Sequence, residues 1–435
     1  MRVLFTVSTW GGHYYCMVPL GWALQAAGHE VRVACPPGQA ATVSGAGLVP
    51  VPVLDGPDLT YWARLTRYQE AVAGTRTLPG MPLHPDTGEP VGKLDEFDVD
   101  AASDRFMGEI FGALHRSYDA AAELARAYRP HLVVHDVLTP EGALAARLAG
   151  APSVYHSLGL YGAAETEPPI DMGLDDPTES FARHGLAPFS REDMPYVIDP
   201  SPSLAVPPHG RTTPLPVRFL PYNGPGATPP AWLLDPPQGG RIGVLWGYSA
   251  TAMYGTGVPV LRTAIETASR LGAEVVVTAG REEVDALGEL PPNVRVLCGF
   301  PLHTLLETCD ALFHHGGAGA MMTAAAAGVP QLALSLSPDQ VVFGGRMAAT
   351  GAVVSVPGLT ASDEQVERAA RTVLGEKSRA AAHALRDDIG AKPTPARLVP
   401  DLERLVRQEG RARPSAPGGT RPTSRPSPEN PGLKA

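Results

Sequence analysis

The 435-residue chain has few of the features that identify several large classes of protein. Its 35 lysines and arginines are outnumbered by 45 aspartates and glutamates, and a net charge of −10 argues against broad electrostatic binding of nucleic acid. No apolar run approaches the roughly 20 residues that cross a bilayer, and the N-terminus lacks the cationic and apolar regions of a secretory signal. We therefore expect a soluble, cytoplasmic protein that binds neither nucleic acid nor membranes.

Cysteine and aromatic residues are also scarce. The four cysteines, Cys16, Cys35, Cys298 and Cys309, show no metal-ligand or C-x-x-C spacing, so we interpret them as buried thiols. Aromatic residues make up only 6% of the chain, whereas glycine (47) and proline (46) are abundant and apolar residues reach 44%. This composition favours a loop-rich α/β protein of two or three domains over a coiled coil or a helical bundle.

Short apolar runs alternate with helical patterns along the first 160 residues, which predicts βαβ units and a parallel sheet. The expected strands are residues 1–8, 30–34, 131–135 and 152–156. The expected helices are residues 19–27, 104–128 and 140–148. Residues 159–216 are rich in proline and glycine and predict a long loop system with short helices.

A second series of the same kind follows a proline-rich stretch. Its expected strands are residues 241–246, 274–278, 294–297, 311–314 and 331–334, and its expected helices are residues 258–271 and 319–327. We therefore predict two Rossmann-like, doubly wound domains that face one cleft. The predicted segments are a first domain (1–216), a linker (217–237), a second domain (238–390), a C-terminal helix (391–409) and a disordered, basic, proline-rich tail (410–435).

Two common site types do not match. A dinucleotide fingerprint needs G-x-G-x-x-G after the first strand and an acid at the end of the second. Here the first turn reads Trp10-Gly-Gly-His13 and the second strand ends in Cys35-Pro-Pro, so we exclude a nicotinamide enzyme. Asp98-Val-Asp100 spells the D-x-D of metal-dependent transferases, but it precedes a helix rather than ending an apolar strand. We interpret it as an acidic helix N-terminus and assign no metal.

The most informative segment runs from Phe313 to Pro330 (FHHGGAGAMMTAAAAGVP). A strand delivers two histidines, and a glycine-rich turn then opens a helix. Glycines let the backbone approach an anion, and the free N–H groups of the first helical turn bind it with help from the helix dipole. The pattern predicts a diphosphate site without a Walker lysine.

This segment, with Ser337-Pro-Asp-Gln340, resembles the C-terminal signature of GT-B glycosyltransferases that use nucleotide-activated sugars. Gly12-His13 to Leu20 with Ala26-Ala-Gly-His-Glu-Val resembles the first βα unit of the antibiotic-type members. Leu132-Val-Val-His-Asp-Val-Leu-Thr-Pro and Tyr222-Asn-Gly-Pro resemble the fourth unit and the linker of macrolide and aromatic-polyketide deoxysugar transferases. The resemblance implies a GT-B fold with the acceptor in the first domain and the nucleotide sugar in the second.

The resemblance also implies donor-binding roles. His315 matches the histidine that contacts the donor diphosphate, and Gly317 and Gly319 match the glycines of the phosphate turn. Asp339 and Gln340 match the pair that binds sugar hydroxyls, and Gly247 and Ser249 match the loop opposite the diphosphate. Two positions depart from the family pattern. Ala320 replaces a threonine or serine that would donate to phosphate, and the base-stacking aromatic falls on Gly299, which leaves Phe300 one place late as the stacking candidate.

The acceptor side offers a candidate base. His13 follows the first strand in a Gly-Gly loop, and imidazole titrates near neutrality, so it can take a proton from an acceptor hydroxyl. Asp136, at the end of the strand 131–135, is expected to orient it as a dyad. A capping or loop histidine and a helix N-cap aspartate are the competing structural interpretations. Aromatic residues near His13 are expected to line an acceptor pocket: Trp10, Tyr14, Tyr15 and Trp62.

The resemblance implies an inverting, metal-independent glycosyltransferase. It would move a deoxysugar from a dTDP-sugar, or a UDP-sugar, to a polyketide-type aglycone in antibiotic biosynthesis. Two alternatives stay open: a transferase that inactivates a finished antibiotic, and a decayed, non-catalytic scaffold subunit. The sequence leaves open an auxiliary activating protein, a homodimer, the identity of sugar and aglycone, and whether the new bond is to oxygen, nitrogen or carbon.

Overall fold

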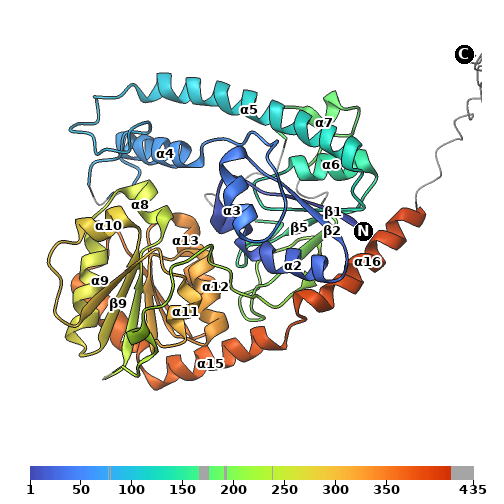
Figure 1. The fold of residues 1–435 in the computed structure, drawn as a ribbon. Helices are drawn as coiled ribbons and strands as arrows, with labels where there is room; N and C mark the ends of the chain where they lie inside the picture. The colour runs from blue at the N-terminus through green and yellow to red at the C-terminus, as the bar shows by residue number, and fades with distance from the viewer. Residues whose placement is uncertain (77, 79, 166–175, 191–193, 238, 413–435) are drawn as a thin grey trace, which may run out of the picture.

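The computed structural model describes residues 1–435 except 77, 79, 166–175, 191–193, 238 and 413–435. The described chain forms two parallel sheets, each with helices on its faces (Figure 1). The first sheet has seven strands in the order β3 Pro50–Val51, β2 Glu30–Ala34, β1 Arg2–Thr6, β4 Leu132–His135, β5 Ser153–His156, β6 Tyr196–Asp199 and β7 Thr213–Pro216. The second has six in the order β10 Val294–Cys298, β9 Glu274–Ala279, β8 Arg241–Leu245, β11 Ala311–His314, β12 Gln331–Ser335 and β13 Val353–Pro357.

The helices follow the strands in both halves. Those of the first half are α1 Gly11–Tyr14, α2 Val18–Ala26, α3 Ala40–Gly45, α4 Leu59–Ala73, α5 Val99–Tyr128, α6 Glu141–Ala149 and α7 Ser180–Arg183. Those of the second half and the C-terminal segment are α8 Tyr248–Tyr254, α9 Pro259–Arg270, α10 Arg281–Ala286, α11 Leu302–Leu306, α12 Ala318–Ala327, α13 Pro338–Ala348, α14 Asp363–Val373, α15 Glu376–Ala391 and α16 Pro395–Ala412. This is the doubly wound α/β arrangement that the alternating pattern predicts.

Local sequence signals set several helix ends. Pro19 lies in the first turn of α2, and Gly28 follows its C-terminus with a φ of +82°, a left-handed conformation that glycine adopts without a steric cost. The Asp58 carboxylate caps α4 by accepting hydrogen bonds from the backbone N–H groups of residues 60 and 61. Asp98 caps α5 in the same way by accepting from Ala101 N at 2.9 Å, so the D-x-D stretch is the acidic helix N-terminus that was expected.

Three parts of the first half and the C-terminal segment differ from the sequence prediction. The residues around His13 form a helical turn, α1, rather than an open loop. The stretch expected to be loops and short helices contributes β6 and β7 to the sheet. The C-terminal helix α16 continues to Ala412 and packs back on α2, where Leu398 and Leu402 join the apolar cluster of the first sheet. The predicted tail lies outside the described residues from 413 onward. No helix in the described ranges is long and apolar enough to cross a membrane.

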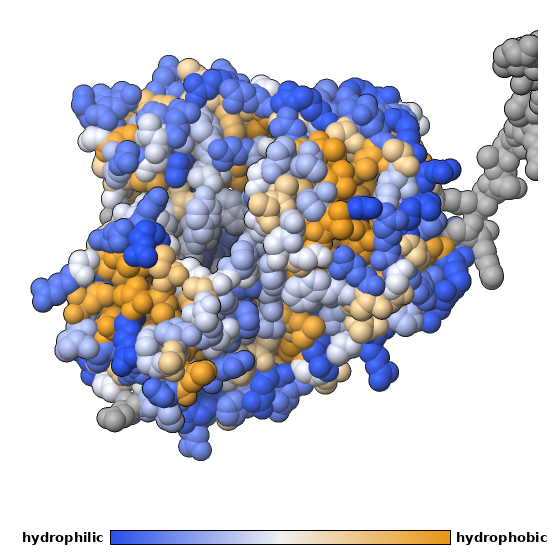
Figure 2. Space-filling view, in the orientation of Figure 1, coloured by the Kyte–Doolittle hydropathy of each residue, from blue (hydrophilic) through white to orange (hydrophobic). Residues whose placement is uncertain are grey.

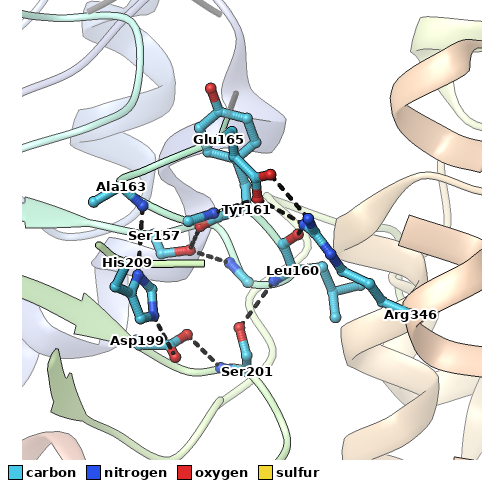
Figure 3. Close-up of polar contacts among 11 residues, drawn as sticks. Ser157, Leu160, Tyr161, Ala163, Glu165, Asp199, Ser201, His209 and Arg346 are labelled. Atoms are coloured by element: carbon cyan, nitrogen blue, oxygen red, sulfur yellow. Dashed lines mark hydrogen bonds and ion pairs between the residues drawn. The ribbon is translucent and has the colours of Figure 1, made fainter. Parts of the chain in front are cut away.

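The two halves contact each other through buried and polar groups. One buried apolar cluster contains Leu160 and Tyr161 of the first half and Met322 and Phe343 of the second. Beside it, Arg346 of α13 binds both oxygens of the buried Glu165 carboxylate, at 2.7 and 2.8 Å, and donates to Leu160 O (Figure 3). Such a bidentate pair has a defined geometry, so it holds α13 against the segment that follows β5.

A network of hydrogen bonds fixes that segment in the first half. The Asp199 carboxylate pairs with His209 Nε2 at 3.0 Å, and Ser201 Oγ accepts from Leu160 N at 3.0 Å (Figure 3). A further contact between the two halves is a hydrogen bond from Arg64 of α4 to Ala252 O of α8, at 2.8 Å. The space-filling view shows the surface hollowed near the centre of this face (Figure 2).

Candidate active site between the two sheets

Strand order identifies one point in each sheet where a ligand site is expected. In an open parallel sheet, ligands bind beyond the carboxyl ends of the strands where the strand order reverses. In the first sheet this point lies between β1 and β4, and in the second it lies between β8 and β11. His13 and Asp136 follow β1 and β4, whereas Gly247 and His315 follow β8 and β11. The candidate residues of both halves therefore come from the reversal points.

His315 is buried and is held by the loop that follows β8. The backbone N–H of Gly247 donates to His315 Nδ1 at 3.2 Å, so Nδ1 carries no proton and Nε2 carries it. Nε2 lies 3.2 Å from Ser249 Oγ, to which it donates. Burial lowers the pKa of His315 to about 4, so the imidazole is neutral near pH 7 and acts as an N–H donor rather than a cation. The expected proximity of Gly247, Ser249 and His315 is thus present.

Two glycines leave room for the His315 ring. A Cβ on Gly247 would lie 2.6 Å from His315 Cε1, and one on Gly317 would lie 2.9 Å from Nε2. Gly316, which lies between His315 and Gly317 in the sequence, has a φ of +92° that only glycine adopts readily. Gly317 is the N-cap of α12, so the N–H groups of residues 318–320 are free to bind an anion. A Cβ at Gly319 would meet no atom within 4 Å, which leaves open space over this turn.

Ala320 and Phe300, the two positions that depart from the family pattern, are both buried in the second half. The Ala320 methyl group is buried in an apolar cluster with Leu312 and Ala324, and its backbone N–H belongs to the first turn of α12. Phe300 is also buried and packs with Leu233 and Leu305. The backbone contact of residue 320 with phosphate and the stacking of Phe300 on a nucleobase stay predictions.

Asp339 and Gln340 open helix α13. Asp339 is partly exposed in the first turn of the helix. The buried Gln340 uses its side-chain oxygen to accept from the backbone N–H groups of Leu336, at 2.8 Å, and Ser337, at 3.3 Å. The Gln340 amide therefore has a structural role at the helix N-terminus, and Asp339 keeps the freer side chain of the pair.

His13 and Asp136 do not form the expected dyad in the described residues. Both Asp136 oxygens are used by the backbone: Oδ2 accepts from Ser8 N at 2.7 Å and Oδ1 from Leu138 N at 2.8 Å. Asp136 is therefore not the N-cap of α6, which is Pro140; it joins the ends of β1 and β4. His13 Nδ1 is buried without a hydrogen-bond partner among the described residues, and burial lowers the pKa of His13 to about 4. The imidazole is thus neutral near pH 7.

The aromatic residues divide among three environments. Trp62, on α4, lines an apolar pocket in the first half that holds about 970 Å³ of empty space, part of it open to solvent. Trp10 and Tyr15 line a second, wider pocket, the cleft pocket, which also includes Tyr248 and Ser249 of the second half. Tyr14 lines neither. It is buried in the core of the first half, and its hydroxyl donates to Gln39 Oε1 at 2.7 Å, which corrects its predicted acceptor role.

The two pockets adjoin and lead toward the phosphate turn. Both include Thr9, Pro57 and Leu59 in their walls. The apolar pocket also includes Ser8 and Leu138, whose backbone N–H groups bind Asp136. The cleft pocket reaches Ser249, which contacts His315. An apolar molecule in the first pocket would therefore lie next to a cleft that ends at the anion-binding turn.

Sequence reasoning missed several residues of this region. Tyr248 is exposed, and its ring lies 6.2 Å from that of Trp10 across the cleft; its position between Gly247 and Ser249 was the available signal. Glu141 lines the apolar pocket with a buried carboxyl group, and it directly follows the Leu-Thr-Pro of the fourth-unit motif. Among the described residues, no group of three or more His, Cys, Asp and Glu side chains is placed to hold a metal ion.

Comparisons with known families cover most of the chain. Residues 22–76 and 98–247 match the family model described as erythromycin biosynthesis protein CIII-like, N-terminal domain. Residues 262–405 match the model of the corresponding C-terminal domain. The two models together take in β4, β8 and β11, with Asp136, Gly247 and His315, whereas β1, His13 and Ser249 lie outside the matched ranges.

Individual relatives and solved structures agree with this match. The chain is 34% identical to aklavinone 7-beta-L-rhodosaminyltransferase of Streptomyces galilaeus, over 97% of this chain and 99% of the relative. It is 34% identical to tylactone mycaminosyltransferase of Streptomyces fradiae, over 96% and 95% of the two chains. The structure of spinosyn rhamnosyltransferase SpnG complexed with thymidine diphosphate superposes with a TM-score of 0.71 at 29% identity, covering 93% of this chain and 100% of the other. The fold is the GT-B arrangement expected from the sequence.

Proposed function

The chain belongs to the erythromycin biosynthesis protein CIII-like family of glycosyltransferases, and from this membership we propose that it transfers a deoxysugar from dTDP to a polyketide-type aglycone with inversion at the anomeric carbon. The relatives are named for transfer of aminodeoxysugars to aklavinone and tylactone, which are aglycones. These names favour a biosynthetic transferase over an antibiotic-inactivating enzyme or a scaffold subunit. A neighbour bound to thymidine diphosphate favours dTDP over UDP.

The donor diphosphate is proposed to bind at the N-terminus of α12. The N–H groups of residues 318–320 are free, and a Cβ on Gly317 would lie 2.9 Å from His315 Nε2, so these donors lie close enough to act on one anion. The Ser249 hydroxyl, 3.2 Å from His315 Nε2, is proposed to face the diphosphate from the loop that follows β8. Asp339 is proposed to bind a sugar hydroxyl. These neutral donors stabilise negative charge without a metal ion, and such preorganised donors act on the charge that develops on the leaving diphosphate.

The acceptor is proposed to bind in the apolar pocket, with its reactive hydroxyl in the cleft pocket near His13. His13 takes the hydroxyl proton as the acceptor oxygen forms a bond to the anomeric carbon, and the carbon–oxygen bond to the diphosphate breaks with its electron pair leaving on the phosphate. Because burial lowers the pKa of His13 to about 4, its basic nitrogen is free of a proton at pH 7. Asp136 is proposed to act indirectly, by holding Ser8 and so the start of the His13 turn.

One observation carries this proposal. The cleft pocket is walled by Trp10 and Tyr15 of the first half together with Ser249 of the second, and Ser249 contacts His315. A hydroxyl and a sugar diphosphate supplied from the two reversal points would meet there. An auxiliary activating protein and a homodimer remain predictions from the family resemblance.

Replacing His13 with alanine tests the assignment of the base. With aklavinone or tylactone as acceptor, we expect kcat to fall by on the order of 10²–10⁴ while dTDP affinity measured by calorimetry stays within about twofold. Glu364→Gln, an exposed change on α14 far from both reversal points, serves as the expression and handling control. Near-normal turnover by the His13 variant would remove His13 from the mechanism.

A further inference from the structure

Glu141 is a buried carboxyl group in the wall of the apolar pocket. It is the first residue of α6 and only 3% exposed. Its Oε1 accepts a hydrogen bond from Ser117 Oγ of α5 at 2.9 Å. Its Oε2 is buried and has no partner among the described residues, and it is the one buried polar atom of this kind in the pocket wall that the structure describes. The neighbouring Thr139 hydroxyl, by contrast, is bonded to Thr6.

The wall around Glu141 is otherwise apolar. It includes Leu54, Ile110, Phe111 and Leu138, as well as Trp62. A buried carboxyl oxygen without a partner is unfavourable in such surroundings, because it has lost its hydrogen bonds to water. An apolar ligand that filled this pocket would leave the unfavourable state in place, whereas a ligand with one suitably placed hydroxyl would remove it.

The ionisation of Glu141 allows its carboxyl group to act as a hydrogen-bond acceptor or as a donor. Burial, and to a smaller extent the nearby charge of Asp136, raises its pKa to about 7, against the opposing effects of hydrogen bonds from its own backbone N–H and from Ser117. Near neutral pH the carboxyl group is therefore present in both protonated and ionised forms. It can accept from a hydroxyl group and, when protonated, donate to a carbonyl oxygen.

We propose that Glu141 is a specificity-determining residue for the acceptor: its free Oε2 hydrogen-bonds an oxygen on the part of the acceptor that enters the apolar pocket. The pocket would then select fused-ring or macrocyclic acceptors that carry a polar group at this position, and would discriminate against the same framework without it. A site that is built to hydrogen-bond a substrate oxygen rejects analogues that lack it, because its own polar group is left unpaired. The inference rests on the proposed function, since it takes the apolar pocket as the acceptor site.

A binding experiment with two probes tests this role. Aklavinone carries oxygen substituents on a fused-ring framework, and anthracene is a fused-ring hydrocarbon without oxygen. Equilibrium dialysis of each probe is done with the wild-type chain and with Glu141→Met, which keeps the length of the side chain but removes its polar atoms. Glu141→Gln retains hydrogen bonding. Glu376→Met is the matched control, because Glu376 is also the first residue of a helix, α15, and is exposed away from the pocket.

We expect Glu141→Met to weaken aklavinone binding about tenfold, as for loss of one hydrogen bond to a charged or polar group, and to leave anthracene binding unchanged or tighter. Glu141→Gln should retain aklavinone binding within about threefold, and Glu376→Met should match the wild type. Equal weakening of both probes by Glu141→Met, or no weakening of aklavinone, would overturn the proposal. If Glu141→Met fails to fold by circular dichroism, a loss of more than tenfold in Glu141→Gln overturns it.

The same experiment separates this inference from the proposed function. dTDP binding to each variant is measured by calorimetry in parallel. If the wild-type chain binds dTDP but neither probe, the acceptor assignment itself fails and Glu141 loses its role with it. If wild-type chain and Glu141→Met bind aklavinone equally, only the inference on Glu141 fails.

Discussion

Replacing Gly247 with alanine tests whether donor binding depends on the exact position of the His315 ring. The added Cβ would lie 2.6 Å from His315 Cε1, closer than the 3.0 Å below which such contacts essentially do not occur. The backbone at Gly247, with φ −80° and ψ 161°, is one that alanine adopts freely. The variant therefore introduces one collision and no backbone strain. The His315 ring must shift away from the loop that follows β8.

The size of the effect follows from the hydrogen bonds that the shift disturbs. His315 is held by Gly247 N and Ser249 Oγ, both at 3.2 Å. Each neutral hydrogen bond contributes about 0.5–1.5 kcal/mol net, so loss of both corresponds to about 1–3 kcal/mol. If this preorganisation serves the diphosphate, dTDP binding weakens roughly 5- to 150-fold.

Calorimetric titration with dTDP measures the change, and the chain offers a matched control. Gly280 follows β9 as Gly247 follows β8, caps the next helix, and has φ −66° and ψ 161°, but a Cβ there would meet no atom within 4 Å. Gly280→Ala should bind dTDP like the wild type. In a His315→Ala background, Gly247→Ala should cost less than about 0.5 kcal/mol, because the ring it strikes is absent. Wild-type affinity in Gly247→Ala, or an equal loss in both backgrounds, would refute the reasoning.

Three other predictions follow from the structure. Ala320→Thr should leave dTDP affinity within about twofold and lower the free energy of unfolding in urea by about 1–3 kcal/mol, because the hydroxyl enters an apolar cluster; tighter dTDP binding would contradict this. Activity should persist after dialysis against EDTA, and strict dependence on added Mg²⁺ would contradict the metal-free donor site. The free energy of unfolding should fall as pH drops from about 6.5 toward 4, by up to about 1.4 kcal/mol per pH unit for each histidine whose folded pKa burial lowers. Those histidines are His13, His135, His156 and His315, with pKa values of about 4, His314, with a pKa of about 3, and His131, whose pKa is also lowered. The stabilising contribution of these histidines is complete above the unfolded pKa of 6.5. It outweighs the opposite effect of the two buried carboxyls Asp136 and Glu141, whose pKa values are raised. A free energy of unfolding that stays constant from pH 7.5 to 5 in urea titrations would contradict this prediction.

The strands at the two reversal points were predictable because each is a continuous apolar run between turn signals. β1 and β8 are flanked on both sides by parallel neighbours, and both faces are covered, so their sequences show no alternation that would obscure them. β6 and β7 were missed for a physical reason. β7 reads Thr-Pro-Leu-Pro and lies at the edge of the sheet, where proline is tolerated because no second neighbour needs its N–H group.

The site was predictable where the backbone alone decides the position of a residue. Gly247, Gly317 and His315 come together because two strands of fixed register end side by side. Positions where a side chain has a choice of direction were not predictable in this way. Phe300 and Ala320 both face the core, and neither the motif nor its spacing specifies that direction.

The proposed donor and acceptor halves of the site differ in whether their buried polar side-chain atoms have hydrogen-bond partners within the chain. On the donor side, both ring nitrogens of His315 have partners. On the acceptor side, His13 Nδ1 and Glu141 Oε2 are buried without partners among the described residues. An unpaired buried polar atom costs free energy that a partner on a bound molecule restores, so polar groups on the acceptor gain more here than they would in a self-satisfied pocket. We therefore expect the chain itself to preorganise the donor half, and we expect polar groups of the bound acceptor to complete the acceptor half.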